Sequence, residues 1–186
     1  MTWASLEAIG AIIAAVAAVI AIWMQNKSFK ANLTADLAMR LEDRFASEEY
    51  KEIRSRAARA LKNHIDEEEA EDAFDFFETV GLLVRRKALD AEVVHSLFFH
   101  WINVYWTAGS HYIPRRRVKS KSLWKDFSAL YVKVLELEKK EDPYSEDISL
   151  SKEDLARYLD DEIALGQSRT LIAVAPSDSQ MSEDQQ

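Results

Sequence analysis

The longest apolar stretch of the chain runs from Ala8 to Met24 and contains no charged side chain. A helix from Trp3 to Met24 would be about 33 Å long, which is enough to cross a hydrocarbon core of about 30 Å. Trp3 and Trp23 suit the two membrane–water interfaces. The pattern therefore predicts a transmembrane anchor over residues 1–26. The alternatives are a cleaved signal peptide, which the lack of basic residues ahead of the stretch disfavours, and an alanine-rich helix buried in an oligomer.

Basic residues follow this stretch and none precede it; those that follow most closely are Lys27, Lys30, Arg40 and Arg44. Positive charge marks the cytoplasmic side of a membrane helix, so we expect a single pass with the N-terminus outside and the remaining chain in the cytoplasm. Within the stretch, Gly10 and Ala14, and Ala17 and Ala21, are small residues four positions apart. This spacing lets membrane helices approach closely and is compatible with self-association of the anchor, although an alanine-rich stretch contains such pairs by chance.

The rest of the chain repeats apolar residues at helical spacing and has few glycines and prolines. Ser47, Asp90 and Ser151 are N-cap residues that mark where helices begin. The pattern predicts helices over residues 27–45, 47–61, 73–87, 91–112, 122–139 and 151–165. The expected fold is all-α: one N-terminal transmembrane helix followed by an irregular cytoplasmic helical bundle.

The expected bundle domain covers residues 27–140. Residues 141–167 are expected to form a linker and a short C-terminal helix, and the polar residues 168–186 a disordered tail.

Three single positions carry expectations about how the helices meet and end. Gly81 lies inside a strongly apolar helical segment, where glycine costs on the order of 1 kcal/mol against alanine, so a close helix crossing is predicted there. Pro114 is predicted to stop the helix over residues 91–112. Gly166 is predicted to end the short C-terminal helix.

Charge and cysteine content exclude several classes of function. The formal net charge is −8, and the acidic excess lies in residues 138–186, which disfavours a nucleic-acid or anionic-lipid surface there. Without cysteine the chain has no disulfides, no thiolate metal sites and no cysteine nucleophile.

Two features suggest metal or catalytic chemistry, and both are interpreted as structural. The acidic run over residues 66–72 lacks the glycine and the alternation of a calcium loop, so it predicts a negatively charged helix start. His95, His100 and His111 lack the spacing of a zinc pair. We therefore expect no metal site, no cofactor and no catalytic residue. The alternative is an enzyme that uses His95, His100 or Glu78 as an acid or base in a polar pocket.

The strongest positive charge outside the predicted anchor is a basic cluster formed by Arg115, Arg116, Arg117, Lys119 and Lys121. Near a membrane, each of these residues would add about 1 kcal/mol of attraction to anionic lipid. The preferred interpretation is a solvated loop that offsets the nearby acidic segments, and the alternative is a surface that contacts lipid or phosphate. Because no aromatic residues alternate with the charges, no nucleic acid is expected as a partner.

Several stretches together resemble one bacterial family. They are the anchor with its basic flank, Arg40 to Phe45, Ser47 to Tyr50, Phe76 to Glu78, Gly81 to Leu83, Arg85 and Arg86, Leu89 and Asp90, Trp101 and Trp106, Ile113 and Pro114, and Arg117. Across residues 5 to 135 the chain resembles the family catalogued as domain of unknown function 4760. The resemblance implies a small protein of the bacterial inner membrane with one membrane helix and a helical cytoplasmic domain. It transfers no activity and no functional residue.

These observations favour a non-enzymatic, membrane-anchored interaction or scaffold module. Its expected partners are the membrane and a protein partner or a second copy of the chain. A membrane-acting toxin or defence effector is the first alternative, and an enzyme the second.

Overall fold

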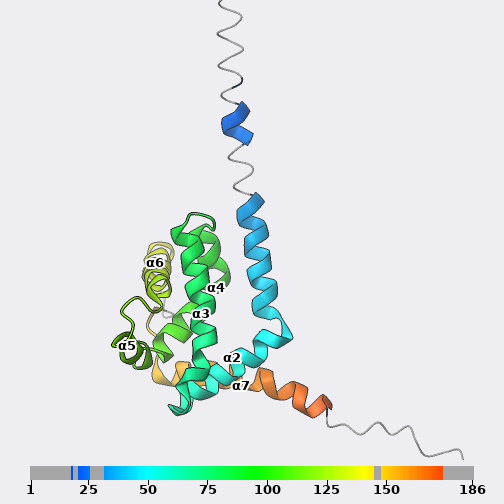
Figure 1. The fold of residues 1–186 in the computed structure, drawn as a ribbon, viewed down its shortest axis with the longest axis vertical. Coiled ribbons are helices and arrows are strands. Elements are labelled where there is room, and N and C mark those ends of the chain that lie inside the picture. The colour runs from blue at the N-terminus through cyan, green and yellow to red at the C-terminus, as the bar shows by residue number, and fades with distance from the viewer. Residues whose placement is uncertain (1–17, 19–20, 26–31, 145–147, 174–186) are drawn as a thin grey trace, which may run out of the picture.

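The computed structural model describes residues 18, 21–25, 32–144 and 148–173 (Figure 1). Every regular element within these ranges is helical, which confirms the all-α prediction. A helix over residues 32–46 precedes the labelled elements. They are α2 (Glu48–Asn63), the 3-10 helix η1 (Glu67–Ala70), α3 (Glu71–Arg85), α4 (Ala91–Ala108), α5 (Tyr112–Arg117), α6 (Lys125–Glu141) and α7 (Lys152–Ala173).

The predicted transmembrane anchor falls almost entirely outside the described residues. Of that stretch only residues 18 and 21–25 are described, and they are helical. Nowhere in the described ranges is a helix both long enough and apolar enough to cross a membrane. The membrane helix and its orientation therefore stay predictions.

The helices begin where local sequence places their caps. The Ser47 hydroxyl accepts a hydrogen bond from the Tyr50 N–H at 3.2 Å, and the Asp90 carboxylate accepts one from the Glu92 N–H at 2.9 Å. The Ser151 hydroxyl accepts one from the Asp154 N–H at 3.0 Å. Each satisfies an amide that the first turn of a helix leaves without a partner, so the three predicted N-caps are confirmed.

Three predicted helix boundaries are wrong: two C-terminal ends and one N-terminal start. The helix from Ala91 ends at Ala108, before Pro114, and Pro114 lies in the first turn of α5, where its missing N–H costs no hydrogen bond. The helix predicted from residue 122 begins at Lys125, after Trp124 in a left-handed conformation. Gly166 lies inside α7, which continues to Ala173.

The core is built around α3, whose aromatic face packs against α6 and α4 (Figure 1). Phe74, Phe77 and Val80 are fully buried. A Cβ atom on Gly81 would lie 2.6 Å from the carbonyl carbon of Asp126, so α6 crosses α3 where only glycine leaves room. This confirms the close crossing predicted at Gly81.

An ion pair fastens the same crossing. Arg85 donates two hydrogen bonds to the Asp126 carboxylate, at 2.7 and 2.9 Å, and these bonds lower the pKa of that carboxyl below its usual range. The pair therefore stabilises the fold at pH values above the unfolded pKa of about 4, and its contribution is lost as the pH falls through the folded pKa.

Acid unfolding tests this ion pair. The Asp126→Asn variant is expected to lose less unfolding free energy than the natural chain when the pH is lowered from neutral to about 3, because its side chain has no proton to gain. Urea titrations at several pH values measure the difference. The Asp36→Asn variant is the control, since Asp36 pairs with Arg40 in an exposed position. An unchanged pH dependence in Asp126→Asn would contradict the assignment.

The C-terminal helix α7 packs along α2, below the other helices in Figure 1. Arg54 of α2 binds Glu162 of α7 through two hydrogen bonds, and both side chains are buried. The Ser55 hydroxyl donates to the Ile163 carbonyl at 3.0 Å, and Ser55 leaves no space for a Cβ atom at Gly166. Residues 141–167, predicted to be a linker and a short helix, therefore contain most of a long helix docked on the bundle. This helix also includes residues 168–173 of the predicted disordered tail, and the other residues of that tail lie outside the described part of the chain.

Candidate functional site

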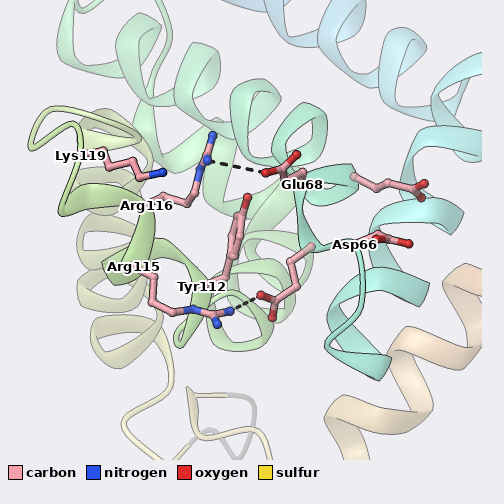
Figure 2. A pocket seen from close by; sticks show the side chains of 8 residues that line it. Asp66, Glu68, Tyr112, Arg115, Arg116 and Lys119 are labelled. Atoms are coloured by element: carbon pink, nitrogen blue, oxygen red, sulfur yellow. Dashed lines mark hydrogen bonds and ion pairs between the residues drawn. The ribbon is translucent and has the colours of Figure 1, made fainter.

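A cleft opens between η1 and α5, which we call the η1–α5 cleft (Figure 2). It is lined by Asp66, Glu67, Glu68, Glu69, Tyr112, Arg115, Arg116 and Lys119. The basic cluster thus faces the acidic run over residues 66–72, which the sequence analysis interpreted only as a negatively charged helix start. Four acidic and three basic side chains share the lining, so the cleft has mixed charge rather than a positive surface.

Two arginines of the basic cluster reach across the cleft to acidic partners: Figure 2 shows Arg115 paired with a carboxylate and Arg116 directed at Glu68, whose Oε1 atom lies 3.9 Å from Arg116 Nη1. Arg115 binds the Oε2 atom of Glu67. The Nε atom of Arg116 lies 2.8 Å from the Oε1 atom of Glu71, which also accepts the Tyr112 hydroxyl hydrogen at 2.6 Å. These contacts join α5 to η1 and to the start of α3.

The remaining members of the basic cluster have different surroundings. Arg117 donates to the carbonyls of Leu123 and Trp124, at 2.8 and 2.7 Å, and so holds the loop that leads into α6. Lys119 and Lys121 are exposed. All three arginines bind groups of the same chain, but the Arg115 side chain stays 63% exposed, so Arg115, Lys119 and Lys121 are the accessible charges. A lipid or phosphate contact of the cluster stays a hypothesis.

At one end of the cleft, two histidines meet a carboxylate. The His64 Nδ1 atom lies 2.9 Å from the His111 Nε2 atom and 3.6 Å from the Glu67 Oε1 atom, and His111 Nε2 contacts the same oxygen. Burial alone would raise the pKa of Glu67, but the hydrogen bond from His111 and the charge of Arg115 lower it. We call these three residues the His–Glu cluster.

Sequence reasoning missed the His–Glu cluster. Only one part of it could have been noticed in the sequence. His64 and Glu67 are three residues apart, a spacing that can bring two side chains together across one turn of the chain. The third member, His111, is 44 residues from Glu67 in the chain. Only the fold brings it there, because the turn after α4 lies beside the turn after α2.

Residues 8–134 match the family described as Domain of unknown function (DUF4760). The chain belongs to this family. No curated protein and no solved structure matches the chain. The η1–α5 cleft and the His–Glu cluster lie wholly inside the DUF4760 region. Glu162 and the rest of α7 follow it, so the buried Arg54–Glu162 pair joins the DUF4760 region to a helix beyond it.

The three residues of the enzyme alternative, His95, His100 and Glu78, contact different neighbours in the described part of the chain. His95 contacts Glu138 at 2.9 Å, while the ring of His100 packs on Trp101 and Tyr158. Glu78 accepts a hydrogen bond from the Phe127 N–H at 2.7 Å, at the start of α6. Burial raises the pKa of Glu78, and this hydrogen bond opposes the rise.

A second concave surface of the DUF4760 region lies between the helix over residues 32–46 and the α3–α4 turn; we call it the N-terminal groove. Its apolar lining includes Ala35, Ala38, Met39, Val84, Leu89 and Leu97. Charged residues Glu42, Lys87 and Lys133 stand among these. Met39 is 59% exposed and belongs to this apolar lining.

Proposed function

We propose that the protein is a non-enzymatic interaction module, held at the bacterial inner membrane by residues 1–26, and that it works as a parallel pair of chains. The observation that supports this proposal is the N-terminal groove, an apolar surface with exposed Met39 on the first helix after the predicted anchor. Apolar patches of this kind mark interaction sites in soluble domains.

A second copy of the chain is the occupant that the sequence favours. The helix over residues 32–46 follows the predicted anchor closely, and the anchor carries small residues spaced for helix pairing. Two anchors paired in parallel bring the two following helices together. The exposed side chains Leu33 and Met39 would then be covered by the other copy.

A non-enzymatic role is in keeping with the side-chain contacts of the cleft. Arg115, Arg116 and Tyr112 bind carboxylates of the same chain, and their contacts fix α5 against η1 and α3. Charged groups engaged in this way hold structure together, and none of these three is placed to attack a substrate.

Thiol crosslinking in membranes tests the pairing, because the chain has no cysteine of its own. The Met39→Cys variant is expected to form a covalent dimer with a short bis-maleimide crosslinker. The matched control is Ser120→Cys, which is also exposed and follows the last residue of α5 by three positions. In Figure 1, α5 lies on the opposite side of the bundle from the helix over residues 32–46. It is expected to stay monomeric.

Two results would contradict the proposal. Equal crosslinking of the two variants would indicate random collision, and a monomeric Met39→Cys variant would show that no second copy covers the groove. Fractionation tests the anchor separately: the full chain is expected with the membranes, and a chain lacking residues 1–26 in the soluble fraction. Release of the full chain by high salt alone would rule out a spanning helix.

A further inference from the structure

The His–Glu cluster brings three metal-ligating atoms to one point from three separate elements. His64 is the residue that ends α2, Glu67 begins η1, and His111 directly precedes α5. The candidate ligand atoms all lie within 4.8 Å of one another. In a tetrahedral zinc site with bonds of about 2.0–2.1 Å, neighbouring ligand atoms are about 3.3 Å apart. The two distances around His64 Nδ1, 2.9 and 3.6 Å, lie on either side of this value, and His111 Nε2 and Glu67 Oε1 lie closer together than it.

Hydrogen bonding alone does not account for this arrangement. The three contacts join His64 Nδ1, His111 Nε2 and Glu67 Oε1 pairwise. His111 Nε2 takes part in both short contacts but has either one hydrogen or one lone pair. The 3.6 Å separation of His64 Nδ1 and Glu67 Oε1 is too long for a hydrogen bond, so hydrogen bonds join the three atoms only in part. A cation at the centre accepts a lone pair from all three atoms. We propose that His64, Glu67 and His111 bind one divalent transition-metal ion, with Zn²⁺ as the first candidate.

The surroundings of Glu67 support a ligand role for its Oε1 atom. Its side chain is 9% exposed, and Arg115 binds the other oxygen, Oε2. A hydrogen bond to the second oxygen fixes the orientation of a metal-binding carboxylate. Asp66, Glu68 and Glu69 line the same cleft and offset the positive charge of Arg115.

The ligand types select the metal. Two imidazoles and one carboxylate suit Zn²⁺ and related transition ions, whereas Ca²⁺ and Mg²⁺ prefer a shell made of oxygen atoms. The side chains of His64 and His111 are 66% and 37% exposed, so the fourth coordination position faces solvent. Such a position accepts water or a ligand from a partner. The metal would also tie the end of α2 to α5, which goes beyond the proposed pairing of chains.

Zinc binding by the purified full chain in detergent, after treatment with a chelator, tests this proposal. Equilibrium dialysis and metal analysis are expected to give one Zn²⁺ per chain, with a higher unfolding temperature in the presence of the ion. His64→Asn and His111→Gln are each expected to weaken binding at least about 100-fold, since even residues that only support a ligand change affinity 10–100-fold. His100→Gln is the matched control and is expected to bind as the natural chain does.

His64→Asn is the decisive variant. His64 has a φ of 56°, a left-handed conformation that asparagine tolerates, and its side chain is mostly exposed, so the variant is expected to fold. Co²⁺ gives a second readout, because tetrahedral coordination produces visible absorption bands that the variant should lose. Equal Zn²⁺ affinity in His64→Asn and His100→Gln, or no Zn²⁺ binding by the natural chain, would overturn the proposal.

Discussion

Replacement of Glu162 by alanine is expected to reduce the free energy of unfolding by about 3–5 kcal/mol, because it leaves the charge of Arg54 buried without its partner. Arg54 and Glu162 are 5% and 1% exposed. The Arg54 guanidinium also lies 4.0 Å from the ring centre of Phe45 and 4.6 Å from that of Trp101, where water cannot replace the carboxylate. Urea unfolding followed by tryptophan fluorescence measures the loss.

Tyr105 completes this buried network and depends on it. Its hydroxyl lies 3.2 Å from the Oε2 atom of Glu162, and burial raises the pKa of the hydroxyl well above its usual value. The tyrosine therefore stays protonated and acts as a donor. Removing Glu162 leaves it only the weaker contact with the Arg54 carbonyl, at 3.3 Å, which adds to the expected loss.

Two further variants separate the ion pair from the helix that carries it. Glu153→Ala removes an exposed carboxylate from the first turn of the same helix α7 and is expected to change stability by less than about 0.5 kcal/mol. The double variant Arg54→Met with Glu162→Leu removes both charges and is expected to recover much of the loss. If Glu162→Ala behaved like Glu153→Ala, the pair would not hold α7 in place.

Replacement of Gly81 by alanine is expected to cost at least about 3 kcal/mol, the upper end of the usual cost of overpacking. The new Cβ atom would lie 2.6 Å from the carbonyl carbon of Asp126 and closer still to its oxygen, and backbone cannot move aside as a side chain can. Alanine ordinarily stabilises a helix by about 1 kcal/mol over glycine. A net loss therefore reports the crossing of α3 and α6 rather than helix propensity.

Gly166→Ala provides the comparison for this variant. Its Cβ atom would meet the side chain of Ser55, at 2.7 Å from the Ser55 Cβ atom, on the α7 side of the bundle. We expect a smaller loss than at Gly81, because α7 packs at the edge of the bundle and can shift more easily than α6. Stabilisation by Gly81→Ala would refute the close crossing.

The sequence alone predicted features that depend on neighbouring residues. An N-cap needs only a short polar side chain and the next three amides, so Ser47, Asp90 and Ser151 were recognisable from local sequence. The close helix crossing at Gly81 was predictable because glycine destabilises a helix, so a glycine inside a strongly apolar helix needs a tertiary explanation. Pro114 and Gly166 show where this reasoning fails: each residue is compatible with two conformations, and the packing around it selects one.

The tertiary structure decided which charged groups meet. The sequence showed the acidic run and the basic cluster but not that they meet. The fold pairs Glu67 with Arg115, which is 48 residues away in the chain. It also brings His111 to His64, across 47 residues, and Arg54 to Glu162, across 108. Caps and helical stripes arise from contacts within about four residues, which a sequence displays directly. Ion pairs and ligand sets arise from the packing of whole helices, and that packing depends on the shapes of all their faces at once.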